Sequence, residues 1–179
     1  MTRLIVITVT LLAALITSIL ITSLGRDSQL HVPAADYRRD WVLLGSFSVR
    51  ADDAEQGAKE LHVVYAAPAT VDAYRRTGAF PAGATLIKDV FATKTEALTT
   101  GLASYAGALK GRFVMVKDSA SGHGGESPLW GDGWGWAFYA GEQTEKTITT
   151  DYRKDCLGCH EPARAQDLIY VQGYPVLKR

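Results

Sequence analysis

Two cysteines and a histidine, residue types that bind metals or react as nucleophiles, lie close together near the C-terminal end of the chain, in the segment Cys156-Leu-Gly-Cys159-His160. Two thiols three positions apart can each add to one vinyl group of the same haem, and the adjoining imidazole then lies under the iron. Cys156 and Cys159 are therefore predicted to attach one haem c covalently, with His160 as the axial iron ligand.

Two other kinds of site also use closely spaced cysteines. A disulfide or thiol redox pair has the same Cys-x-x-Cys spacing, but it is expected at the start of a βαβ unit, and no such unit is visible here. A zinc site needs more ligands than one cysteine pair and one adjacent histidine supply. Haem attachment is therefore the favoured interpretation of these residues.

The iron needs a sixth ligand only if its second side is closed, and the sequence offers few candidates. No methionine follows His160, and Met115 lies in an apolar strand, where it is expected to fill the core. His31 and His123 lie in a tether and in a glycine-rich loop. His62 falls in a predicted strand, where a buried structural role competes with a role at the haem. We expect an open iron position, which binds and transforms small ligands.

A lysine interrupts an apolar row in the segment 85–91. With a period of two, Lys88 shares one face of a strand with Leu86 and Val90. Considered alone, Lys88 is expected on an edge strand, with its stem packed and its ammonium group in water.

The elements that must position these residues follow an apolar N-terminal segment. Residues 4–24 carry no charge, and the run is long enough to span a bilayer as a helix. Residues 1–25 are therefore predicted to be a signal peptide or a transmembrane signal anchor, and residues 26–35 a polar tether. The short cationic start predicts export of the remainder to the periplasmic side of a bacterial inner membrane, secreted or membrane-anchored.

The folded domain, residues 36–179, is predicted to be α+β, with a mainly antiparallel sheet, a few short covering helices and the apolar helix before it. A short helix is expected over 68–78, because Pro68 suits its start and Gly78 its end, and another over 35–40. Segments rich in β-branched and aromatic residues predict five strands, over 41–49, 61–67, 85–93, 112–117 and 134–140.

Composition excludes one class of partner. The chain is 47% hydrophobic and 21% charged, as in an ordinary globular domain. Its 19 Lys and Arg residues balance 19 Asp and Glu residues. Because no basic field gathers phosphates, nucleic acid is not expected as a partner.

Several segments together resemble the cytochrome P460 family. They are the haem motif followed by Tyr174-Pro-Val-Leu177, and the segments 61–65, 74–78, 83–90 and 136–139. The resemblance runs from about residue 37 to the end of the chain. It implies an antiparallel-sheet domain, a homodimer and a single five-coordinate c-type haem.

The resemblance also implies roles for particular residues. Lys88 matches the lysine that family members bond to a meso carbon of the porphyrin, which replaces the edge-strand interpretation. A distal carboxylate shortly before the haem motif corresponds by spacing to Asp151, with a solvated loop acid as the alternative. His62 stands where relatives can carry an arginine. Asp151 and His62 are therefore the candidate catalytic residues.

The function implied is the oxidation of hydroxylamine, nitric oxide or both, with electrons passed to a soluble cytochrome c. One alternative is a nitric oxide or gas-binding protein without turnover, like the cytochromes c′-beta, and another is a simple electron carrier. Because cytochromes c′-beta lack the lysine cross-link, Lys88 favours the first function.

Overall fold

The structure is a computed structural model that describes residues 30–119 and 127–178. The predicted signal or anchor segment, residues 1–25, lies outside the described residues, as does His123. Within the part of the chain that is described, no helix has the length and apolar character needed to cross a membrane.

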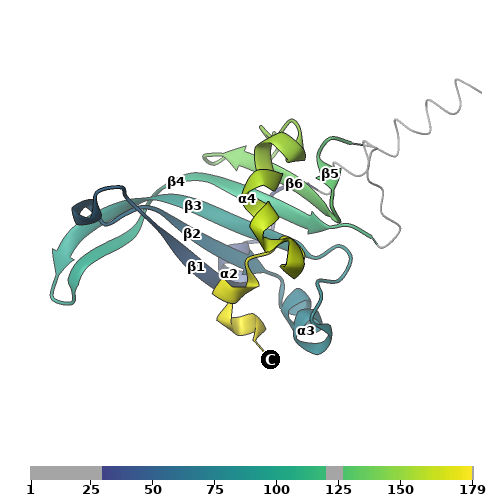
Figure 1. Ribbon diagram of the computed structural model, residues 1–179, viewed down its shortest axis with the longest axis horizontal. Coiled ribbons are helices and arrows are strands. Elements are labelled where there is room, and N and C mark those ends of the chain that lie inside the picture. The colour runs from purple at the N-terminus through teal and green to yellow at the C-terminus, as the bar shows by residue number, and fades with distance from the viewer. Residues whose placement is uncertain (1–29, 120–126, 179) are drawn as a thin grey trace, which may run out of the picture.

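One antiparallel sheet forms the body of the domain, with the strand order β1-β2-β3-β4-β6-β5 (Figure 1). Its strands are β1 (Val42–Arg50), β2 (Ala58–Ala66), β3 (Thr85–Leu98), β4 (Gly101–Lys117), β5 (Trp130–Gly131) and β6 (Trp134–Ala140). The predicted mainly antiparallel α+β class is therefore confirmed for the described residues.

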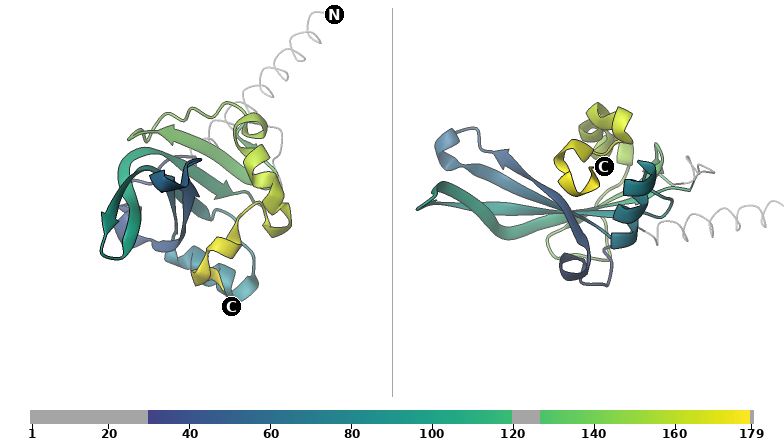
Figure 2. Two further views of the ribbon diagram at one scale, coloured as in Figure 1. Left: turned by 60° about the vertical axis from the view of Figure 1, so that its left-hand side comes forward. Right: turned by 90° about the horizontal axis from the view of Figure 1, so that it is seen from below.

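Helical elements are short and lie on both faces of the sheet. They are α2 (Tyr37–Asp40), η1 (Ala54–Gln56), α3 (Pro68–Thr77), the π-helical turn η2 (Arg153–Leu157), α4 (Gly158–His160), η3 (Glu161–Gln166), η4 (Val171–Gly173) and η5 (Pro175–Leu177). Figure 2 shows the segment from η2 to η5 on one face of the sheet and α2 on the other.

The two predicted helices are present with small changes at their ends. In α3, Pro68 occupies the first turn, and Gly78 ends the helix with φ of 79°, a left-handed conformation that glycine adopts without strain. The second helix, α2, is shorter than predicted. Its Tyr37 hydroxyl donates to the fully buried Asp89 at 2.7 Å, so that α2 is held against the sheet.

Successive side chains of β3 point to opposite faces of the sheet and so belong to two different hydrophobic cores. Leu86 packs in the core under the C-terminal segment, whereas Ile87 packs in the core on the side of α2. Lys88 follows Leu86 in the period of two and so faces the C-terminal segment. Because β3 is paired with β2 on one side and β4 on the other, the expectation of an edge-strand Lys88 is wrong.

Strands β3 and β4 continue well beyond their predicted ends. They pair from Thr85 opposite Val116 to Leu98 opposite Gly101, and their tips project from the sheet (Figure 1). Residues 94–110 contain many small and polar residues, so the apolar alternation that marks a strand is weak there.

Candidate functional site

A cavity of about 450 Å³ lies between the sheet and the C-terminal segment. It brings together five of the residues predicted from the sequence: Lys88, His62, Cys156, Cys159 and His160. Most of the rest of the lining is apolar, including Phe47, Val64, Leu86, Phe113 and Trp136. A volume of this size with few polar groups is typical of a site for a small molecule or cofactor.

The two cysteines reach the cavity because η2 and α4 form one continuous helical segment. Positions i, i+3 and i+4 share one face of a helix, so Cys156, Cys159 and His160 are directed to the same side. Both thiols are free, with Cys156 buried and Cys159 exposed. Burial and the neighbouring Asp155 carboxylate raise the pKa of Cys156 to about 11, which keeps this thiol protonated in neutral solution.

The imidazole of His160 is oriented by a backbone hydrogen bond. Its Nδ1 lies 2.7 Å from the carbonyl oxygen of Leu168. Because a carbonyl only accepts, Nδ1 carries the proton, and the lone pair of Nε2 remains available for a metal. Burial lowers the pKa of His160, which favours this neutral form. Trp136 packs against the ring edge to face, with centroids 4.9 Å apart.

Lys88 enters the cavity from the middle of the sheet. Its Nζ lies 4.4 Å from the ring centroid of Phe113, its partner across β3 and β4. Among the described residues no carboxylate lies within ion-pair distance of Lys88. Desolvation by burial lowers the pKa of Lys88, although the nearby thiols and Glu60 oppose that shift. The amine therefore loses its proton more readily than a surface lysine and becomes nucleophilic.

His62 lines the cavity as one member of a polar chain. Its Nε2 lies 3.0 Å from Oε2 of Glu60, and the other carboxylate oxygen of Glu60 accepts a hydrogen bond from Lys110. Hydrogen bonds from Lys110 and His62 hold the pKa of Glu60 below its usual value, so Glu60 is ionised. Sequence reasoning missed Glu60, although its i, i+2 spacing to His62 places both side chains on one face of β2.

The family follows from comparison with known proteins. A sequence profile described as Cytochrome P460 matches residues 34–171. The chain belongs to the cytochrome P460 family. This confirms the resemblance found in the sequence, and it makes the chain a c-type haem protein of that family. A search of curated proteins finds no match.

The residues of this cytochrome P460 fit a haem. Its cavity is mainly apolar, which suits the faces of a porphyrin, and two thiols and one neutral imidazole lie along a single wall. The described residues contain no group of three or more histidine, cysteine or carboxylate side chains that could hold a metal ion by themselves. Two free thiols and one imidazole whose Nε2 lone pair is available suit a metal that arrives within a macrocycle.

The candidate acid Asp151 is not brought to the cavity of the cytochrome P460. Its Oδ1 accepts a hydrogen bond from the backbone of Arg153 at 3.0 Å, and Lys154 lies 3.9 Å from its other oxygen. Asp155 lines the cavity instead. Backbone hydrogen bonds from Thr150 and Asp151 lower the pKa of Asp155. Spacing in the sequence pointed to Asp151 and not to Asp155, because the turn of η2 decides which carboxylate points inward.

Proposed function

We propose that this cytochrome P460 binds one haem c through thioether bonds from Cys156 and Cys159, with His160 as axial ligand, and oxidises hydroxylamine, nitric oxide or both. The observation that carries the proposal is the placement of Lys88 in the same apolar cavity as the Cys-x-x-Cys-His residues. Lys88 is half-buried in this apolar cavity and has no carboxylate partner among the described residues, so its ammonium group loses hydration without an ion pair to replace it.

The proposed role of Lys88 is a covalent bond from its nitrogen to a meso carbon of the porphyrin. Bond formation removes one hydrogen from the amine and one from the meso carbon, so a two-electron oxidant such as a peroxide must accept both. A third tether beside the two thioethers would prevent the ring from sliding and hold it distorted. Distortion of the macrocycle is one means by which a protein changes haem electronics.

Hydroxylamine oxidation needs a proton acceptor as well as an electron acceptor. Conversion of NH₂OH to NO releases three protons and three electrons. When bound, the haem supplies an iron that binds the nitrogen and carries electrons away. His62 is the proposed acceptor of protons: with Nε2 donating to Glu60, its Nδ1 is free to take a proton. Glu60 stabilises the resulting imidazolium. Lys110, which is half exposed, connects this row of polar side chains to solvent.

The proposed setting is the periplasmic side of a bacterial inner membrane, with residues 1–25 as signal or anchor. A soluble cytochrome c is the proposed one-electron acceptor. These proposals rest on the N-terminal apolar segment and on the need to remove electrons singly from the iron.

A homodimer is the proposed assembly. Pairing of β4 with β6 begins at Gly111, so that over residues 101–109 the described strand pairs with β3 alone. That edge carries no charge, and Leu102 is 55% exposed. Edge strands are usually protected by charge or proline, so an uncharged free edge favours pairing with a second copy.

The spectrum of the purified holoprotein tests the proposal directly. A strongly red-shifted ferrous Soret band, together with hydroxylamine-dependent reduction of a cytochrome c, is the expected result. An ordinary c-type spectrum with nitric oxide binding and no turnover would replace the enzyme by the gas-binding alternative. Release of haem into organic solvent from the denatured protein would remove covalent attachment altogether.

A further inference from the structure

Two consecutive residues next to the site have an uncommon backbone conformation. Asp167 has φ of 59° and Leu168 has φ of 63°, both in the left-handed region. Aspartate is found there several times more often than most residues, whereas a bulky side chain such as leucine is an outlier. Leu168 is buried, and its carbonyl oxygen is the acceptor for Nδ1 of His160. An observed outlier of this kind at a site is a reason to look for what maintains it.

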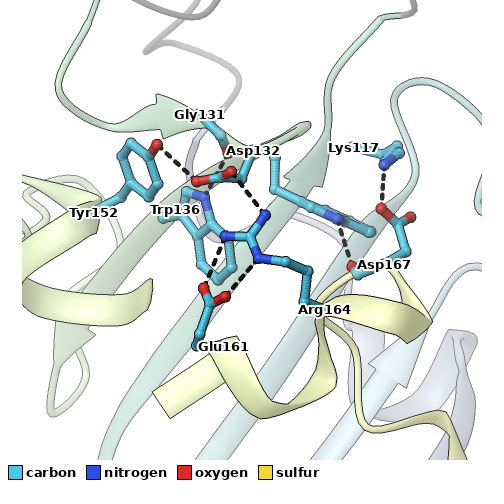
Figure 3. A network of polar contacts seen from close by, with 9 residues as sticks. Lys117, Gly131, Asp132, Trp136, Tyr152, Glu161, Arg164 and Asp167 are labelled. Atoms are coloured by element: carbon cyan, nitrogen blue, oxygen red, sulfur yellow. Dashed lines mark hydrogen bonds and ion pairs between the residues drawn. The ribbon is translucent and has the colours of Figure 1, made fainter. Parts of the chain in front are cut away.

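Two hydrogen bonds hold Asp167 against the end of the sheet. Its carboxylate accepts a hydrogen bond from Nζ of Lys117 at 2.7 Å, as Figure 3 shows. Its carbonyl oxygen accepts one from Nε1 of Trp134 at 3.0 Å. Lys117 and Trp134 face each other across β4 and β6, and the ammonium lies 4.9 Å from the indole centroid. We refer to these three residues as the Lys117–Trp134–Asp167 clasp.

Two of the three clasp residues are shielded from solvent, whereas the side chain of Asp167 is 39% exposed, and a second ion pair holds the same segment. Trp134 is fully buried, and the side chain of Lys117 is only 19% exposed. On the other side of the segment, Arg164 binds Asp132 at 3.1 Å (Figure 3). Several contacts on either side of the left-handed turn therefore hold its backbone in place. Backbone strain persists in a folded protein when the surrounding contacts fix the conformation in this way.

We propose that the Lys117–Trp134–Asp167 clasp positions His160, by keeping Leu168 in the left-handed conformation that presents its carbonyl oxygen to Nδ1. This inference rests on the proposed function, in which Nε2 of His160 binds iron. A hydrogen bond from Nδ1 makes an imidazole a stronger donor to its metal, and partners of this kind tune the metal site. Lys117, Trp134 and Asp167 are positioning residues, since they act on the iron only through Leu168 and His160.

The consequence of losing the clasp follows from the strain. With the Lys117 contact removed, Leu168 is free to relax toward a right-handed or extended conformation, and its carbonyl oxygen turns away from Nδ1. The imidazole is then a weaker donor. A weaker axial donor stabilises ferric iron less, so the reduction potential rises and the iron–histidine stretching frequency falls.

The test uses the holoprotein and two variants that remove the ion pair in different ways. Lys117→Met removes the charge and keeps the length of the side chain. Asp167→Asn also removes the charge but keeps a residue that tolerates the left-handed region. Lys154→Met is the matched control, because Lys154 is 78% exposed and lies 3.9 Å from Asp151, away from the turn.

The readouts are resonance Raman spectra of the ferrous protein and the midpoint potential. Lys117→Met and Asp167→Asn are expected to lower the iron–histidine stretching frequency and raise the potential, whereas Lys154→Met leaves both at wild-type values. Wild-type values in both clasp variants would overturn the inference. If the wild-type protein itself shows no iron–histidine band, the proposed role of His160 fails instead, so the two failures are distinguishable.

A second substitution tests whether the effect of Lys117→Met comes from the strained backbone of Leu168 or from a general loss of packing in the segment. Glycine adopts the left-handed conformation without strain, so Leu168→Gly added to Lys117→Met should return the stretching frequency toward the wild-type value. A merely structural clasp predicts the opposite, because deleting a buried leucine side chain would loosen the segment further. Failure of this rescue, with the haem still attached, would contradict the proposed mechanism.

Discussion

The ammonium nitrogen of Lys88 lies 4.4 Å from the ring centroid of Phe113, within the cavity that also contains Cys156 and His160. Interaction with an aromatic face stabilises a cation by only about 0.5–2 kcal/mol, less than the cost of removing an ammonium group from water. The lysine is thus placed as an amine that gives up its proton readily, beside the residues expected to hold the ring.

Lys88→Ala should therefore give an intact haem protein without a cross-link. A tryptic haem peptide of the wild-type protein is expected to join the segment containing Lys88 to the one containing Cys156 and Cys159, as mass spectrometry would detect. In the variant this junction is absent, the ferrous Soret band takes an ordinary c-type position, and hydroxylamine oxidation is lost.

The matched control for this substitution is Lys94→Ala. Lys94 lies on the same strand but is exposed on the projecting part of β3, outside the cavity lining. It should keep the wild-type spectrum and turnover. If Lys88→Ala also keeps the wild-type spectrum, the proposed oxidation of hydroxylamine is wrong and gas binding is the better account of the function.

Substitution of either cysteine tests the attachment. Cys156→Ala or Cys159→Ala should leave the haem on one thioether or lose it, because each thiol is expected to bind one vinyl carbon. Denatured wild-type protein should keep its colour after extraction with acidified organic solvent. Ala163→Ser, a small change in the following η3 turn, is the control, and it should retain covalent haem. A pyridine haemochrome spectrum identical to that of the wild-type protein in both cysteine variants, which would mean that neither thioether was lost, would contradict the motif interpretation.

The sequence predicts an element of this fold well when the residues of that element alone determine its conformation or burial. The strand over 134–140 matches β6 at both ends, because its aromatic residues fill the core. Pro68 and Gly78 likewise marked α3 through their own backbone preferences. The projecting ends of β3 and β4 were missed, since residues 94–110 have no buried face to impose alternation.

The same distinction applies to the site. The haem-attachment residues were predictable, because the attachment itself requires two thiols three positions apart and an adjoining imidazole. They are Cys156, Cys159 and His160. Glu60 was not, because its importance depends on a contact with Lys110, fifty positions away. Asp155 rather than Asp151 lines the cavity, and only the path of the π-helical turn decides that.

Pairing through the β4 edge predicts a change in assembly. Ala106→Lys places a charge on the exposed, uncharged part of β4, where a lysine disfavours edge-to-edge pairing. The variant is expected to sediment as a monomer where the wild-type chain sediments as a dimer. Ala69→Lys, at an exposed position on α3, should leave the dimer intact. A dimer in Ala106→Lys would place the contact elsewhere.

Glu60 should contribute to stability in a pH-dependent way. Hydrogen bonds from Lys110 and His62 lower its folded-state pKa, so its stabilisation is present above the unfolded value of about 4.5 and is lost as pH falls through the folded value. Because the pair with Lys110 is partly exposed, the contribution at pH 7 is expected to be below about 1 kcal/mol.

Urea unfolding of the wild-type protein and Glu60→Gln measures this contribution. The difference in the free energy of unfolding should be largest near neutral pH and disappear below the folded-state pKa of Glu60. Glu55→Gln, an exposed acid in η1, should give no comparable trend. A difference that stays constant between pH 7 and pH 3 would mean that the carboxylate charge of Glu60 is not what stabilises the fold.

The polar chain from His62 to Glu60 predicts a graded loss of turnover. His62→Ala removes the proposed proton acceptor and should lower hydroxylamine oxidation by about 100-fold, the usual scale of general-base catalysis. Glu60→Gln should cost less, since the imidazole remains and loses only the carboxylate that stabilises its cation. Asp151→Asn, whose side chain lies outside the cavity lining, should retain near wild-type turnover. Stopped-flow reduction of cytochrome c at saturating hydroxylamine measures all three. If Asp151→Asn loses activity while His62→Ala keeps it, the proton acceptor is Asp151, and the carboxylate must move into the cavity when substrate binds.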